Sequence, residues 1–176
     1  YIGMGRDDRL DIISWANSII KEDKQAEIVL YGTSMGGSTV LMASGEDLPS
    51  NIKAIISDCA YTSIYDLFDY EVRNYMNSSS FPIIDFLNAT TVLRAGYSLK
   101  NASPIDAVKK SKVPILYFHG DKDSFVPISM MNKLYNATSS TKKKVTIKGG
   151  EHANSDLAQP KTYWTSIKNF LKQYVN

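Results

Sequence analysis

Cysteine is almost absent from this sequence: Cys59 is the only one among 176 residues. A single thiol can form neither an internal disulfide framework nor a cysteine-rich zinc site, so both classes of small scaffold are excluded. We expect Cys59 to be a small buried hydrophobe.

Long hydrophobic runs and a charge excess are also lacking. The longest apolar pieces are short, such as "PILYF" at 114–118, whereas a bilayer-spanning helix needs about 20 residues. The formal net charge of +2 is too small to indicate nucleic acid or an anionic membrane as a partner. With 43% hydrophobic and 22% charged residues, the chain has the composition of one globular domain with one core. We therefore expect a single domain over residues 1–176, no nucleic-acid binding and no membrane span in this segment.

The hydrophobic pattern alternates between two periods along the chain. Short apolar runs predict strands, and apolar residues at helical spacing predict helices. The expected strands are 26–32, 52–58, 113–120 and 143–150. The expected helices are 7–23, 35–44, 127–136 and 161–175. Strands that alternate with helices favour the α/β class, with a parallel sheet covered by helices on both faces.

One stretch is too long for a simple crossover between strands. Residues 60–112 separate the second and third expected strands and contain several aromatic residues, among them the tyrosines and phenylalanines at 61, 65, 68, 70, 75, 81 and 86. We interpret this stretch as a helical insertion, or lid, whose aromatic side chains partly face the carboxyl edge of the sheet.

A serine lies between glycines directly after the first strand, in "LYGTSMGGSTVLMAS". A strand that runs straight into a helix must turn sharply, and Gly32 and Gly36 let the two elements approach closely. The turn exposes the hydroxyl of Ser34 at a helix N-terminus, where the N–H of Met35 can stabilise an oxyanion. This pattern is typical of a nucleophilic serine.

A nucleophilic serine needs a base, and the sequence has two histidines. His119 lies within the apolar third strand and is expected to be structural. His152 lies in "KGGEHANS", on a glycine-rich loop at the edge where Ser34 also emerges. We predict that His152 is the base.

The base in turn needs a carboxylate to orient its ring. Asp121 and Asp123 follow the third strand in "HGDKDSFVP", and Asp58 ends the second strand at the same edge. Asp121 beside Gly120 could instead hydrogen-bond its own turn. Spacing alone leaves the three carboxylates as alternatives.

Three segments together resemble the α/β-hydrolase superfamily: "GTSMGG", "HGDKDSFVP" and "GGEHANS", in that order. The resemblance extends over the whole chain and is strongest to bacterial esterases and serine aminopeptidase-like hydrolases. It implies that Ser34 is the nucleophile, His152 the base and Asp123 the acid, because H-G-x-x-D-x-x-V-P matches His119 to Pro127. It also implies a carboxylic ester substrate, with an amide or thioester as alternatives, and no metal or organic cofactor.

The N-terminal end departs from that superfamily. "YIGMGRDDRLDIISW" resembles the stretch that leads into the nucleophile strand, so the chain resembles the C-terminal part of the fold. The loop that supplies a second oxyanion donor has no counterpart, and losing such a donor typically costs about a hundred- to a thousandfold in turnover. A non-catalytic binding module is therefore the alternative function. An uncovered strand at 26–31 predicts self-association, and cellular location stays open.

Overall fold

Four parallel strands form the centre of the protein. A computed structural model describes residues 2–175. The strands are β1 (Ile28–Thr33), β2 (Ile52–Asp58), β3 (Ile115–Gly120) and β4 (Lys142–Ile147). They form one sheet in the order β1-β2-β3-β4, and each neighbouring pair is parallel. All carboxyl ends therefore lie at one edge, where the expected functional residues follow the strands.

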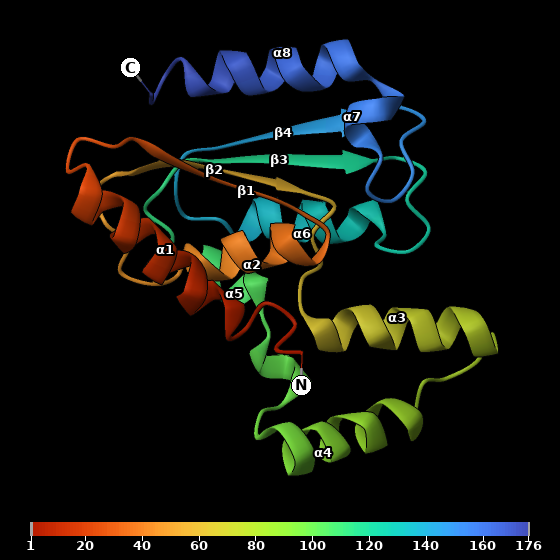
Figure 1. Ribbon diagram of the computed structural model, residues 1–176. Helices are drawn as coiled ribbons and strands as arrows, with labels where there is room; N and C mark the ends of the chain where they lie inside the picture. The colour runs from red at the N-terminus through yellow and green to blue at the C-terminus, as the bar shows by residue number, and fades with distance from the viewer. Residues whose placement is uncertain (1, 176) are drawn as a thin grey trace.

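Helices cover both faces of this sheet, as the sequence pattern predicted (Figure 1). One face packs against α1 (Asp8–Glu22), α2 (Met35–Ala43), α5 (Pro104–Val108) and α6 (Ile128–Ala137). The other face packs against α8 (Pro160–Leu171). Successive side chains of a strand point to opposite faces, so Ile55 joins the cluster under α2 while Ile56 joins the cluster under α8. Burial on both faces explains why β2 shows no polar alternation.

The observed elements agree with the sequence-based bounds to within a few residues. β4 ends at Ile147 instead of residue 150, because Gly149 adopts a φ of +76° and turns the chain away from the sheet. Pro127 precedes α6 as its N-cap instead of lying inside its first turn. The short helix α7 (Ser155–Ala158) was not expected, because four residues are too few to show a helical period.

The expected insertion, residues 60–112, contains α3 (Ile64–Met76), α4 (Ile83–Ala95), the 3₁₀ turn η1 (Leu99–Asn101) and α5. α3 and α4 project away from the sheet (Figure 1). Its aromatic residues divide into two groups. Tyr61, Tyr65, Phe68 and Tyr70 belong to the hydrophobic cluster beneath the insertion, whereas Tyr75, Phe81 and Phe86 are exposed. That the insertion acts as a lid stays a prediction.

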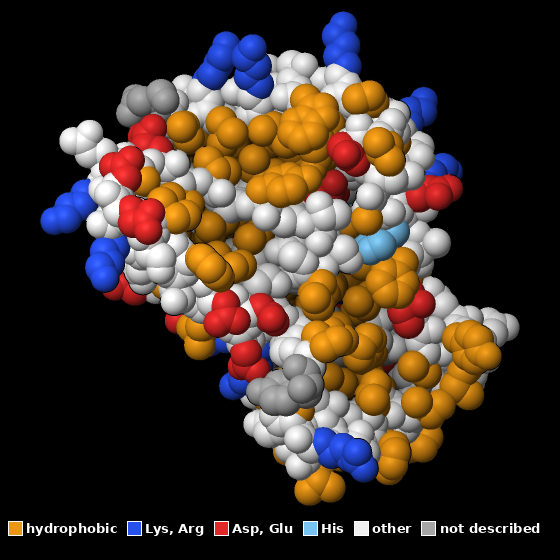
Figure 2. Space-filling model, in the orientation of Figure 1, with side chains coloured by type: hydrophobic (Ala, Val, Ile, Leu, Met, Phe, Trp, Pro, Cys, Tyr) orange, Lys and Arg blue, Asp and Glu red, His pale blue; other side chains and the backbone are white. Residues whose placement is uncertain are grey.

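β1 lies at an edge of the sheet and, within residues 2–175, pairs only with β2. Tyr31 in this strand and Trp164 in α8 are each about half exposed. Hydrophobic side chains gather in the surface region between β1 and α8 (Figure 2). Over the same range, every helix is too short or too polar to cross a bilayer.

Candidate active site

Ser34 occupies a sharp turn between β1 and α2. Its backbone angles are φ 55° and ψ −118°, a conformation that residues other than glycine rarely adopt. Such strain persists only where neighbours hold it. Here the Ser34 N–H donates to the carbonyl oxygen of Asp58 at 2.9 Å, and the N–H of Ser38 donates to the Ser34 carbonyl oxygen at 2.9 Å. The turn is thus bonded to β2 on one side and to α2 on the other.

The glycines around Ser34 differ in what they allow. A Cβ on Gly32 would lie 2.3 Å from the carbonyl carbon and oxygen of Gly36, and one on Gly37 would lie 2.7 Å from the Asp58 carbonyl oxygen. A Cβ on Gly36 would meet nothing within 4 Å. The expected close approach therefore depends on Gly32 and Gly37. The expectation that it also needs a missing side chain at Gly36 is wrong, because that residue contributes only its backbone.

His152 lies within hydrogen-bonding distance of Ser34. The distance from Ser34 Oγ to His152 Nε2 is 2.8 Å. His152 follows β4, and its side chain is 24% exposed, so the ring is partly accessible to solvent. The structure thus brings together the serine and the histidine that the sequence selected.

Asp123 lies on the far side of the His152 ring. Its Oδ2 is 2.8 Å from His152 Nδ1, and its Oδ1 accepts the N–H groups of Phe125 and Val126 at 3.0 and 2.8 Å. Burial raises the pKa of Asp123, but hydrogen bonds from His119, His152 and the Val126 N–H lower it further, so its pKa lies below the usual range. An ionised carboxylate can only accept, so the shared proton is on Nδ1 and Nε2 is free to accept from Ser34.

The two other candidate carboxylates have different contacts. Asp121 Oδ1 accepts the N–H of Gly149 at 2.7 Å, and Asp58 Oδ1 accepts the hydroxyl of Ser155 at 2.8 Å. Both hold the loop that carries His152, one before it and one after it. Neither is among the hydrogen-bond partners of the His152 ring in the described residues.

Two further side chains support the site, one with an expected structural role and one that was not predicted from the sequence. His119 is expected to be structural, and it is fully buried; its Nε2 donates to the Val126 carbonyl oxygen at 2.7 Å and lies 3.3 Å from Asp123 Oδ2. It therefore holds the segment that presents Asp123. Phe125 packs edge-on against the His152 ring, with a centroid distance of 5.0 Å. The sequence signal for both is their position inside "HGDKDSFVP".

Met35, the expected oxyanion donor, is the first residue of α2. The first N–H groups of a helix have no partner within the helix and carry its positive end. The Met35 N–H follows Ser34 directly, so it is available to a developing negative charge near the serine.

Cys59, Asp123 and His152 offer ligand atoms within 4.8 Å of one another. Burial, reinforced by the charge of Asp58, raises the pKa of Cys59 to about 12, so the thiol is neutral near pH 7. Metals bind the thiolate, and His152 Nδ1 is already bonded to Asp123. The neutral Cys59 thiol and the occupied His152 Nδ1 favour the hydrogen bond between His152 and Asp123 over metal ligation at these three residues. We therefore assign no metal to the site.

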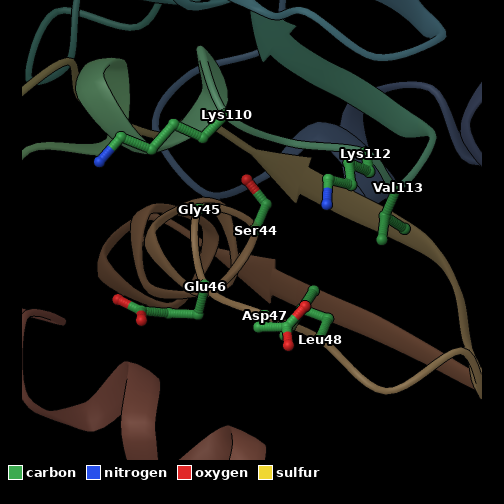
Figure 3. A pocket seen from close by; sticks show the side chains of 8 residues that line it. All are labelled: Ser44, Gly45, Glu46, Asp47, Leu48, Lys110, Lys112 and Val113. Carbon is green, nitrogen blue, oxygen red and sulfur yellow. The ribbon is translucent and has the colours of Figure 1, made fainter.

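A separate cleft of about 280 Å³, lined in part by charged residues, lies between the end of α2 and the start of β3. In Figure 3, Glu46 and Asp47 lie on one side of it, and Lys110 and Lys112 lie on the other. This cleft is at the amino end of β3, whereas Ser34, Asp123 and His152 follow the carboxyl ends of their strands. Its charged groups therefore take no part in the chemistry at Ser34.

The topology and the strand-turn-helix at Ser34 define an α/β-hydrolase fold. The sequence model of the prolyl oligopeptidase family matches residues 3–176 of this chain. The chain therefore belongs to that family. An acylaminoacyl peptidase from Pyrococcus horikoshii aligns with a TM-score of 0.74 at 17% identity, over 98% of this chain and 28% of that one. A Pyrococcus furiosus esterase aligns with a TM-score of 0.71 at 14% identity, over 96% of this chain and 62% of that one. At these identities the two structures show the fold alone.

Relatives in sequence are longer than this chain. The uncharacterized protein YqkD of Bacillus subtilis is 26% identical over 166 residues, which is 94% of this chain and 54% of YqkD. The α/β hydrolase domain-containing protein WAV2 of Arabidopsis thaliana is 26% identical over 155 residues, 85% of this chain and 48% of WAV2. The chain thus spans about half the length of these relatives.

Proposed function

We propose that this chain carries the reacting groups of a serine hydrolase that cleaves a carboxylic ester. The single observation that carries the proposal is the continuous hydrogen-bonded series from Ser34 Oγ through His152 to Asp123, with 2.8 Å at each step. A serine hydroxyl is a weak nucleophile until a base accepts its proton. An imidazole held by a buried, ionised carboxylate is a base of the required kind.

In the first half of the reaction, Ser34 Oγ attacks the carbonyl carbon of the ester while His152 Nε2 takes the hydroxyl proton. The carbonyl oxygen becomes negative and accepts the Met35 N–H, at the positive end of α2. The carbon–oxygen bond to the leaving group then breaks, and the imidazolium gives its proton to the departing alcohol. Asp123 stabilises the imidazolium throughout and keeps its own charge.

In the second half, water replaces the alcohol. His152 Nε2 takes a proton from the water as its oxygen attacks the acyl carbon, and the imidazolium then returns that proton to Ser34 Oγ. The products are a carboxylic acid and the free serine. An amide or a thioester would follow the same steps with a different leaving group, so the triad sets the reaction type and the surrounding pocket sets the substrate.

The test is turnover of a short p-nitrophenyl ester by the full-length protein. We expect Ser34→Ala to reduce kcat by about 10⁴-fold or more, since removal of a member of such a triad leaves only residual catalysis. Thr33→Ser, a change beside the nucleophile, is the matched control and should keep turnover. Undiminished activity of Ser34→Ala would contradict the proposal.

A binding module is the second candidate function. Within residues 2–175, β1 pairs only with β2, and Tyr31 is about half exposed. Both features favour a binding role, because an unpaired strand edge is a template for pairing with another chain. In that case the Ser34 variant would change nothing in an ester assay, and association would be the measurable activity.

A further inference from the structure

The loop that carries His152 is bonded to the core on both sides of the histidine. Before it, the Gly150 carbonyl oxygen accepts the Lys122 N–H at 2.8 Å. After it, the Ser155 hydroxyl donates to Asp58 Oδ1 at 2.8 Å. Between them Ala153 has a φ of 56°, a sparsely populated conformation that persists only when its neighbours hold it. The position of the imidazole thus depends on bonds outside the triad.

Asp58 contacts both reacting segments. Its backbone oxygen accepts the Ser34 N–H at 2.9 Å, and its side chain accepts from Ser155, three positions after His152. Asp58 is 2% exposed and Ser155 is fully buried, so water cannot replace this bond. One residue at the end of β2 therefore fixes the nucleophile turn with its backbone and the histidine loop with its carboxylate.

Neighbouring groups on several elements face this carboxylate. Tyr163 on α8 also hydrogen-bonds Asp58, and the Tyr163 hydroxyl lies 3.0 Å from that of Tyr31. His119 on β3 favours its ionised form, and Asp156 on α7 opposes it. Burial has the largest effect and raises the pKa of Asp58. A carboxylate buried there is costly, and its hydrogen bonds from Ser155 and Tyr163 offset part of that cost.

We propose that Asp58 is a positioning residue that sets the distance between Ser34 and His152 through its bond to Ser155. The effect on turnover rests on the proposed hydrolase function. The effect on the geometry of His152 does not, because the His152–Asp123 hydrogen bond exists whether or not a substrate is cleaved.

Three single variants and one double variant test the bond. Ser155→Ala removes the donor and Asp58→Leu removes the acceptor, and each should lower kcat by about 10- to 100-fold, since a displacement of roughly 1 Å can cost a hundredfold. KM should stay near its wild-type value, because neither residue is assigned a substrate contact. Asp58→Asn keeps an oxygen that accepts from Ser155 and should retain kcat within about threefold. In the double variant Asp58→Leu/Ser155→Ala the loss should not exceed that of the worse single variant, because each single variant already removes the Asp58–Ser155 bond.

Ser44→Ala is the matched control. The Ser44 hydroxyl is also buried and donates to a carbonyl oxygen at 2.7 Å, but it lies at the far end of α2. This variant loses a comparable hydrogen bond, so a general loss of stability would appear in it as well. We expect it to keep the wild-type kcat.

Proton NMR of the His152 Nδ1–H, which donates to Asp123, reports the geometry of this hydrogen bond and does not depend on catalysis. In Ser155→Ala and Asp58→Leu we expect this resonance to shift or broaden, while Ser44→Ala and Asp58→Asn keep it. An unchanged resonance together with wild-type kcat in Ser155→Ala would overturn the positioning role. If the wild-type protein hydrolyses no ester, the hydrolase proposal fails, and the resonance alone still decides between the two outcomes for Asp58.

Discussion

Ser34 and His152 are 118 positions apart in the chain, yet their side chains meet at 2.8 Å. The parallel order of β1, β2, β3 and β4 produces this contact, because every carboxyl end lies at one edge of the sheet. Asp123 reaches the same edge after β3. Ser34, Asp123 and His152 thus come from three different loops that lie at one edge of the sheet.

The identity of the acid can be tested with a pair of neighbouring aspartates. Asp123→Asn should reduce kcat by about 10⁴-fold, because an amide can donate to Nδ1 and so favours the wrong tautomer of His152. Asp121→Asn keeps an oxygen for the Gly149 N–H and should retain most activity. Steady-state kinetics of both variants with one ester would contradict the assignment if Asp121→Asn were the more damaged enzyme.

The close packing of the turn at Ser34 predicts opposite effects on stability for alanine substitutions at two glycines. A methyl group on Gly32 would collide with the backbone of Gly36, so Gly32→Ala should destabilise the protein by about 1–3 kcal/mol or more and abolish activity. Gly36→Ala places its methyl group in open space and should stay within about 1 kcal/mol of the wild type. Urea denaturation measures both. Equal losses in the two variants would show that the turn does not depend on the contact at Gly32.

Stability should respond to pH in opposite directions at Asp123 and Asp58. The folded-state pKa of Asp123 is lowered, so its ionisation stabilises the fold above the unfolded-state value of about 3.9, and this contribution is lost as pH falls through the folded pKa. The destabilisation by Asp123→Asn should therefore be constant down to about pH 5 and shrink as the pH falls further.

The folded-state pKa of Asp58 is raised, so the sign is reversed. Its protonated form favours folding below about pH 3.9, and this advantage is lost as pH rises toward the folded pKa. Relative to the wild type, Asp58→Asn should therefore gain stability as pH rises. Denaturation curves across this range test both residues, and a change of the same sign in the two variants would contradict the assigned environments.

The edge of β1 predicts self-association. Its outer backbone groups are unpaired within residues 2–175, and such edges pair with other chains. Sedimentation velocity over a dilution series of the 176-residue chain should show a species larger than a monomer that dissociates on dilution. Ser34→Ala should sediment in the same way, because the serine does not form the edge. A monomer at every concentration would exclude this mode of association.

Much of the fold could be predicted from the sequence, because the strands and most of the helices outside residues 60–112 differ in length and in the spacing of their apolar residues. The four strands are where the apolar runs indicated, and Ser34 lies at the turn that "GTSMGG" predicted. The bounds shifted where a single backbone angle decides the end of an element, as at Gly149.

The roles of the aspartates could not be derived from spacing. Asp58, Asp121 and Asp123 all follow strands at the same edge, and only side-chain direction separates them. That direction depends on local turns and on Ser155, which belongs to a helix too short to show a period. The family resemblance selected Asp123 from the three aspartates. In the structure, Asp123 contacts the His152 ring, whereas Asp121 and Asp58 hydrogen-bond the loop that carries His152.

Covalent labelling with a fluorophosphonate probe tests the central claim most directly, because the probe reacts only with a serine whose proton is taken by a base. In the full-length protein we expect one labelled residue, Ser34, with labelling abolished in His152→Ala and retained in Asp121→Asn. Peptide mapping after proteolysis identifies the site. A protein that is folded, with intact His152 and Asp123, and yet leaves Ser34 unlabelled would contradict the account.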